Sequence, residues 1–153
     1  MDLQSLVDDA ERDRIAKLVV GAVVHDRGRV LILRRSLSDD FLPGIEELPS
    51  GGVEAGESLM EALARELAEE VGWSGPVEPD AGFTASFDYV SGSGRPARQY
   101  TFGLAWNGSP VVLSGEHTGH RWIAPGELGA TDLSPESRQT IREWAAHTAA
   151  SGV

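Results

Sequence analysis

The stretch GGVEAGESLMEALARELAEEVGW, residues 51–73, joins a glycine-rich start to a strongly helical second half. Ser58 followed by Glu61 forms a capping-box pattern, in which two side chains satisfy backbone N–H groups at the start of a helix. The interior is mainly Leu, Met, Ala, Glu and Arg, which favour helix, and Gly72 is a typical helix stop. We therefore predict a helix from Ser58 to Val71, preceded by a loop.

Acidic side chains gather on one side of this helix. At about 100° per residue, Glu66, Glu69 and Glu70 fall within roughly a third of the circumference, beside the apolar arc that packs on the core. That arc is formed by Met60, Leu63, Ala64, Leu67 and Val71. Glu66 repels Glu69 and Glu70 by about 0.2 to 0.5 kcal/mol each. The spacing places Arg65 nearer to Glu61 and Glu69, so it leaves the repulsion around Glu66 in place.

These glutamates have two explanations, a solubilising helix surface or a site for a dication. Carboxylate oxygens are the hard ligands that Mg²⁺ and Mn²⁺ prefer, and a dication would relieve the repulsion. The loop before the helix suits an anion, because Gly51, Gly52 and Gly56 allow close backbone approach and the helix N-terminus adds a positive dipole. A glycine loop alone is more often a simple turn.

The same segment resembles the Nudix box, which reads glycine, five residues, glutamate, seven residues, Arg-Glu, an aliphatic residue, any residue, Glu-Glu, any residue, glycine and a bulky apolar residue. Every fixed position is met, by Gly51, Glu57, Arg65, Glu66, Leu67, Glu69, Glu70, Gly72 and Trp73. So many fixed residue types at fixed spacing are a specific signal. The resemblance covers about residues 17–147, including the Leu48-Pro49 lead-in.

The resemblance implies an α/β fold, an α/β/α sandwich around a mixed β-sheet. It implies hydrolysis of the pyrophosphate bond in a nucleoside diphosphate linked to another moiety, with Mg²⁺ or Mn²⁺ as cofactor. Glu66 and Glu70 would be metal ligands, and Gly51 would offer its backbone carbonyl to the metal. Glu69 would be a ligand or the residue that activates water, so Glu66 and Glu69 are the first catalytic candidates.

Three other residues receive roles from the same resemblance. Glu57 and Arg65 would organise the loop and the helix, which is mainly a structural role. Glu116, six residues before Trp122, lies where some family members carry the general base, and it is our second candidate for that role. A solvated acidic loop residue is an equally good explanation of Glu116.

Cationic and aromatic side chains are candidates for substrate contact. Arg34, Arg35 and Arg98 could meet phosphate from strand ends, although ordinary surface arginine is the commoner explanation. Six strand aromatics could stack on a base, but such residues usually fill a core, so we expect only one or two to reach the pocket. They are Phe83, Phe87, Tyr89, Tyr100, Phe102 and Trp106.

Two weaker cues lie near these candidates. Tyr89 stands at about the distance beyond the box where Nudix enzymes acting on dinucleoside polyphosphates carry a tyrosine. His117 and His120 do not match a helical His-Glu-x-x-His zinc pattern, and we interpret both as loop residues.

Composition limits the class of protein. With 153 residues, 41% hydrophobic, the chain is long enough for one globular domain with a buried core. The net charge of −11 and a single lysine, Lys17, argue against stable nucleic-acid binding, and an acidic protein acting on phosphates needs a dication between them. The longest uninterrupted apolar run, from Leu18 to Val24, is too short to span a membrane. The chain has no cysteine, and its acidic N-terminus lacks a secretory pattern. We therefore expect a soluble, cytoplasmic protein without membrane contact.

The rest of the chain predicts helices packed on both faces of a mixed sheet. We expect a helix within residues 3–16, strands at 17–25, 30–33, 82–90, 99–106 and 121–124, a structured loop at 36–57 and a last helix at 135–149 capped by Ser134. Residues 1–16 would be an N-terminal helical extension, and 17–153 a single Nudix hydrolase domain.

Several functional alternatives stay open. The substrate could be a nucleoside triphosphate, a nucleotide sugar, ADP-ribose or a dinucleoside polyphosphate, and the chain could be a monomer or a homodimer. A non-catalytic Nudix-like nucleotide-binding or regulatory domain is the main rival, which the complete acidic set disfavours. Isomerisation of an isoprenoid diphosphate is disfavoured by the lack of cysteine, while kinase and serine-hydrolase classes lack their motifs.

Overall fold

The computed structural model describes residues 2–37 and 44–150. Its helices and strands alternate along the chain, which is typical of a mixed α/β protein. In order they are α1 Leu3–Arg12, β1 Lys17–Asp26, β2 Arg29–Arg35, β3 Glu46–Glu47, β4 Ser50–Gly52, α2 Leu59–Val71, β5 Thr84–Val90, β6 Pro96–Ala105, β7 His117–Ile123, the 3₁₀ helix η1 Pro125–Ala130 and α3 Pro135–Ala150.

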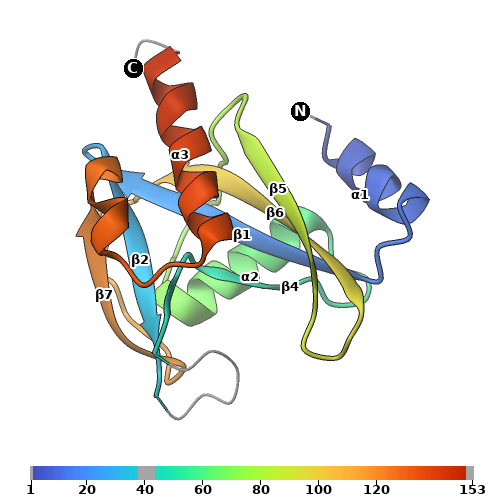
Figure 1. Ribbon diagram of the computed structural model, residues 1–153, viewed down its shortest axis with the longest axis horizontal. Helices are drawn as coiled ribbons and strands as arrows, with labels where there is room; N and C mark the ends of the chain where they lie inside the picture. Colours follow the sequence, from blue (N-terminus) through green and yellow to red (C-terminus); the bar gives the residue numbers. More distant parts are fainter. Residues whose placement is uncertain (1, 38–43, 151–153) are drawn as a thin grey trace.

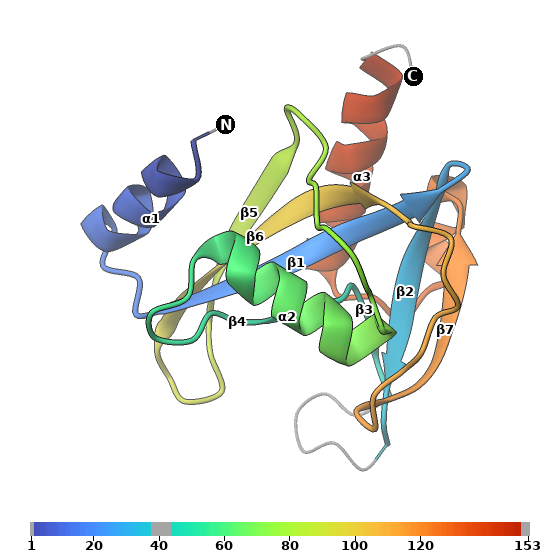
Figure 2. The ribbon, with the colours of Figure 1, turned by 180° about the vertical axis from the view of Figure 1, so that it is seen from behind.

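The strands of the described residues form one mixed sheet that opens in the middle. Its order is β3-β2-β1-β6-β5, with β4 paired to β1 and β7 paired to β2. β1 runs parallel to β6 along its length, whereas the other pairs are antiparallel. β2 pairs with β1 only next to the hairpin, where His25 faces Val30 and Asp26 faces Arg29. Further along the same edge of β1, from Gly21 back to Val19, the partner is β4. β3 and β4 therefore lie in the opening between β1 and β2 (Figure 2).

The turn between β1 and β2 sets this geometry. Asp26 and Arg29 face each other across a two-residue loop of Arg27 and Gly28, whose φ angles are 54° and 77°. Two central residues with positive φ are typical of the tight hairpin turns whose twist matches that of the strands.

Helices cover both faces of the sheet, as predicted. α3 lies over one face in Figure 1, and α2 lies over the other in the reverse view of Figure 2. On the α2 side, Leu63 and Leu67 pack with alternate residues of β1, β2 and β6, and the apolar residues of α1 join this cluster. On the α3 side, Ile141 and Trp144 pack with the intervening residues of the same sheet. This alternation explains the long buried runs in β1, β2 and β6.

Polar contacts hold the first and last helices in place. The hydroxyl of Tyr100 donates to the Leu6 carbonyl at 2.7 Å, and Arg98 pairs with Asp13 at 3.0 Å, so α1 is tied to β6. Buried Glu46 accepts two hydrogen bonds from Arg121, both 2.8 Å, and a third from the Asp132 N–H at 2.9 Å. Glu46 thus fixes the segment that leads into α3.

The predicted elements mostly agree with the structure. The helix after Ser58 is confirmed with both capping-box bonds, and Gly72 ends it in the left-handed conformation at φ 74°. Ser134 caps α3 by accepting from the Ser137 N–H at 3.1 Å. The first helix ends at Arg12, earlier than the predicted limit, because the chain turns to enter β1 and Arg14 takes φ 59°.

Two expectations need correction. The segment 36–57 contains β3 and β4 rather than loop alone, because neighbouring strands pair with its backbone despite its glycines and prolines; residues 38–43 of that segment lie outside the described residues. The strand predicted at 121–124 begins at His117, so His117 and His120 lie in β7 and not in a loop. No helix of the described residues is long and apolar enough to cross a membrane.

The cap of α2 gives a first prediction. Ser58→Ala removes the acceptor of the Glu61 N–H, now 3.1 Å from the hydroxyl, so we expect the free energy of unfolding to fall by about 1 kcal/mol in urea titrations. Ser86→Ala, at an exposed position of β5, is the control and should change it by less than about 0.5 kcal/mol. Equal losses in both variants would contradict the capping role.

Candidate functional site

The site is built where α2 meets the backbone of β4. Two glutamates from successive turns of α2, Glu66 and Glu70, reach the same short strand. A Cβ placed on Gly51 would lie 1.9 Å from Cδ of Glu66, so only glycine allows this carboxylate to lie against the strand. The Ser50 N–H donates to Oε1 of Glu70 at 3.1 Å.

Arg65 links the loop, the strand and the helix. Its Nε and Nη2 donate to the two oxygens of Glu57 at 2.7 and 2.9 Å, and Nη2 also donates to the Gly52 carbonyl at 2.9 Å. Nη1 donates to Oε1 of Glu66 at 2.7 Å. This pairing with Arg65 lowers the pKa of Glu57 to about 2.

The prediction that Arg65 lies nearer to Glu61 and Glu69 than to Glu66 was wrong. Spacing on a helix surface placed it nearer Glu61 and Glu69, but Arg65 contacts Glu66 closely and approaches Glu69 only to 3.7 Å. The reason is tertiary, because the guanidinium turns toward the β4 backbone and the Glu57 carboxylate instead of lying along the helix.

The buried carboxylates repel one another. Burial raises the pKa of Glu70 to about 9, and the nearby charges of Glu47, Glu66 and Glu116 add to the effect. Burial also raises the pKa of Glu66, against the lowering effect of Arg65. Perturbed carboxyl groups held together in this way mark a candidate functional site, since a cation would favour their charged forms.

The other two acidic candidates lie at the rim of this cluster. Glu69 is on α2 with its side chain 59% exposed, next to the buried pair. Glu116 is exposed just before β7, where its carbonyl accepts from the Ser36 N–H at 2.9 Å. Its carboxylate is near enough to Glu66 and Glu70 to raise the pKa of both.

Two residues of the cluster were missed by sequence reasoning. Glu47 comes from β3 and His117 from β7, and the His117 Nε2 lies 2.7 Å from Oε2 of Glu47 and 3.7 Å from Oε2 of Glu70. For Glu47 the sequence holds part of the signal, because neighbouring side chains of a strand point to opposite faces and Glu47 must therefore point away from Glu46. The sequence does not say which of the two faces the site. No sequence signal identified His117, because its direction depends on an irregularity in strand pairing.

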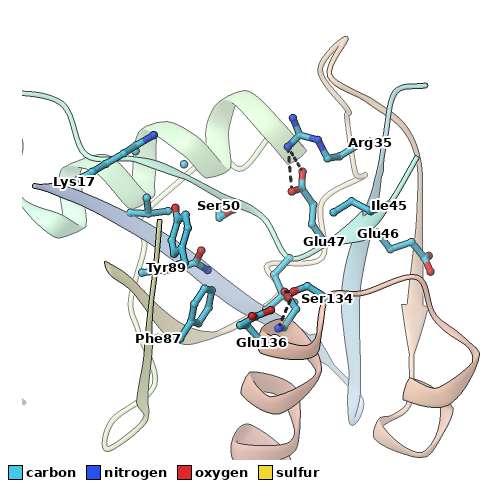
Figure 3. Close-up of a pocket in the computed structure, with 16 residues that line it drawn as sticks. Lys17, Arg35, Ile45, Glu46, Glu47, Ser50, Phe87, Tyr89, Ser134 and Glu136 are labelled. Carbon is cyan, nitrogen blue, oxygen red and sulfur yellow. Dashed lines mark hydrogen bonds and ion pairs between the residues drawn. The ribbon is translucent and has the colours of Figure 1, made fainter. Parts of the chain in front are cut away.

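A pocket of about 380 Å³ lies between β3, β4, β5 and the start of α3. Figure 3 shows Phe87 and Tyr89 on one wall and Glu136 with Ser134 near the start of α3. The Phe87 and Tyr89 rings are 5.8 Å apart and both are partly exposed. The pocket also borders the Ser50–Gly52 strand, which contacts Glu66 and Glu70 of α2 as well.

The aromatic residues divide as the sequence suggested. Phe83, Tyr100 and Phe102 are buried in the core, whereas Phe87 and Tyr89 line the pocket. Trp106 packs at the edge of the α2-side cluster.

The three candidate arginines lie in different places. Arg35 lines the pocket and contacts both oxygens of Glu47 at 3.2 Å (Figure 3). Arg34 points elsewhere, donating to the Gly44 carbonyl at 2.6 Å and to Asp132 at 3.0 Å. Arg98 pairs with Asp88 and Asp13 on the side of β6 that faces α1, outside the pocket lining.

Comparison with known proteins agrees with this arrangement. A family model described as NUDIX domain matches residues 16–144. The chain is 32% identical over 127 residues to the uncharacterized Nudix hydrolase YfcD of Shigella flexneri, covering 80% of this chain and 68% of that protein. It is 29% identical over 133 residues to the nucleoside triphosphatase NudI of Escherichia coli O17:K52:H18, covering 82% and 94%.

The fold also resembles that of solved structures. The MutT protein from Methanosarcina mazei Go1 superimposes with a TM-score of 0.74 at 27% identity, over 86% of this chain and 94% of that one. The expected α/β/α sandwich around a mixed sheet is thereby confirmed.

Burial of Glu70 predicts how stability depends on pH without metal. The pKa of Glu70 is about 9 in the folded chain against an ordinary 4.5, so the folded state holds the extra proton between these values. Its contribution to stability is complete below about pH 4.5 and is lost as the pH rises toward 9, by up to about 1.4 kcal/mol per pH unit. Urea titrations in chelator at pH 6 and pH 8 should show this loss in the native chain and a smaller one in Glu70→Gln. The same pH dependence in both proteins would show that another group titrates.

Proposed function

The chain belongs to the Nudix family, and on that premise we propose that it hydrolyses a pyrophosphate bond in a nucleotide substrate with the help of a divalent metal. One observation carries the proposal. Glu66 and Glu70 are both held against the backbone of β4, and the same strand borders the pocket. Groups that hold metal and a space for substrate therefore share one wall.

The residues present fit a hard dication. The cluster offers carboxylate oxygens from Glu66, Glu69 and Glu70, and Mg²⁺ and Mn²⁺ prefer oxygen ligands. The backbone carbonyl of Gly51 stays a ligand proposed from the family resemblance alone. The raised pKa of Glu70 supports the same assignment, because a cation bound beside this buried carboxyl would stabilise its charged form. When bound, Mg²⁺ or Mn²⁺ neutralises the diphosphate and lowers the pKa of a bound water.

The chain's own groups have separate tasks. Arg65 holds the loop and Glu66 in place through its contacts with Glu57 and the Gly52 carbonyl. Glu69, exposed beside the metal candidates, is the first choice to take a proton from the attacking water, and Glu116 at the rim is the second. Neither role needs a covalent intermediate on the enzyme.

The pocket supports a nucleotide as the substrate. Phe87 and Tyr89 present partly exposed rings on which a base can stack, and Arg35 places a cation near the metal candidates, where a phosphate would lie. Because NudI is named a nucleoside triphosphatase, nucleoside triphosphates are the first class to test. The products would then be a nucleoside monophosphate and pyrophosphate. Arg34 and Arg98, which are held by other contacts, receive no part in substrate binding.

The proposal is tested by product release from a panel of nucleoside triphosphates, nucleotide sugars, ADP-ribose and dinucleoside polyphosphates, with Mg²⁺, with Mn²⁺ and with chelator. Glu70→Gln should reduce metal-dependent turnover by at least about 100-fold while the chain stays folded. Glu78→Gln, at an exposed loop position, is the control and should keep native turnover. Turnover that survives in Glu70→Gln would remove Glu70 from the metal site, and a panel with no cleavage would contradict the hydrolase.

Two neighbouring glycines give a matched test of the α2–β4 contact. Gly51→Ala places a methyl group on the Glu66 carboxylate, which must swing away because it is the flexible partner, so we expect turnover to fall at least tenfold with little loss of stability. At Gly52 the nearest atom to an added Cβ is Cε of Lys17 at 3.5 Å, an ordinary contact, so Gly52→Ala should stay near native. Steady-state kinetics and urea titration of both variants distinguish these outcomes, and equal activities would contradict the role of the contact.

A further inference from the structure

Three potential metal ligands from separate elements lie close together at the edge of the pocket. They are Glu47 of β3, Glu70 of α2 and His117 of β7, and one ligand atom of each lies within 4.8 Å of the others. The His117 Nε2 is 2.7 Å from Glu47 and 3.7 Å from Glu70. Donors bound to one metal ion at about 2.1 Å stand roughly 3.0 to 3.5 Å apart, so small side-chain movements suffice to enclose an ion.

An irregularity in strand pairing turns His117 toward this place. In regular alternation His117 would point to the same side of β7 as Arg121, whose guanidinium contacts Glu46. The register of β2 and β7 shifts between Arg34 and Arg35, so that Arg35 faces His117 and Thr118 is the extra residue. Bulges of this kind commonly re-aim a side chain at a functional site.

Each donor is oriented by its surroundings. The Ser50 N–H occupies Oε1 of Glu70 and leaves Oε2 toward His117. Arg35 holds the carboxylate of Glu47 from the pocket side, as an outer partner commonly does for a metal ligand.

The imidazole of His117 is almost completely enclosed, with its side chain 1% exposed. Its Nδ1 is buried and has no hydrogen-bond partner among residues 2–37 and 44–150. The ring proton can therefore move to Nδ1 without breaking a hydrogen bond of that atom, and a cation can then replace the proton that Nε2 shares with Glu47.

We propose that Glu47, Glu70 and His117 form a metal site of mixed nitrogen and oxygen ligands, suited to Zn²⁺ or Co²⁺ rather than to Mg²⁺. Imidazole is a ligand for transition metals, whereas Mg²⁺ selects oxygen. The site shares Glu70 with the carboxylate group of Glu66 and Glu69 but differs from it in chemistry. It does not rest on the proposed hydrolysis, because the ligands come together in the chain without any substrate.

The competing explanation is a hydrogen-bond network in which His117 donates from Nε2 to Glu47, which in turn holds Arg35. Both explanations keep His117 buried, so loss of stability on mutation would not separate them. The protonation and ligation of Nε2 separate them, because a metal replaces the proton on this atom.

The first experiment uses the native chain, labelled with ¹⁵N, and follows the ring nitrogens of its four histidines during titration with Zn²⁺ in the absence of nucleotide. We expect the Nε2 resonance of His117 to shift at one equivalent, before those of His25, His120 and His147. An unchanged His117 ring at saturating Zn²⁺, or shifts confined to the other histidines, would overturn the proposal.

Matched variants supply the second experiment. His117→Gln and Glu47→Gln should each weaken Zn²⁺ binding in calorimetry by tenfold or more, with Mg²⁺ binding changed by less than about threefold. His120→Gln is the control, because His120 is an exposed histidine of the same strand. Native Zn²⁺ affinity in folded His117→Gln would overturn the site, and if that variant does not fold, the NMR titration decides. A chain that binds Zn²⁺ through His117 yet cleaves no nucleotide would contradict only the proposed hydrolysis.

Discussion

The close contact between α2 and β4 determines where the acidic side chains of this protein lie. The contact is possible because Gly51 has no side chain, so the Glu66 carboxylate occupies the space that a Cβ would need. One turn later, Glu70 accepts a hydrogen bond from the same strand. β4 in turn depends on β1, whose edge is left to it when β2 turns away after the hairpin. A small number of backbone pairings thus positions the whole cluster.

This arrangement places unfavourable electrostatics at the centre of the site. Glu70 is buried among other carboxylates, and the single arginine in direct contact with the α2 glutamates, among the described residues, is Arg65. Arg65 is already engaged with Glu57, so it compensates the cluster only in part. The chain also carries a net charge of −11, which disfavours an anionic substrate. A cation between protein and phosphate would reduce both the repulsion among the carboxylates and the repulsion of the anionic substrate. The proposed metal and the proposed substrate therefore depend on each other.

Much of the fold was predictable because local signals agreed with the tertiary result. The α2 helix has its cap, its apolar arc and its glycine stop within a short segment, so tertiary packing had nothing to override. The hairpin at Arg27 and Gly28 is likewise local. The short strands β3 and β4 were not predictable, because segments of two and three residues with glycine and proline have no periodicity and gain their structure only from neighbouring strands.

The sequence by itself determined the family resemblance, the acidic helix and the class of chemistry, because a motif with fixed spacing on one helix retains its meaning in any context. Only the tertiary structure decided which charges meet. It turned Arg65 toward Glu57 and Glu66, sent Arg98 to the α1 side of the sheet, and brought His117 to Glu70 through a shift in the pairing of β2 and β7. These outcomes depend on strand register and on which of several partners, distant in sequence, a long side chain contacts. The spacing of residues along the chain predicts neither of them.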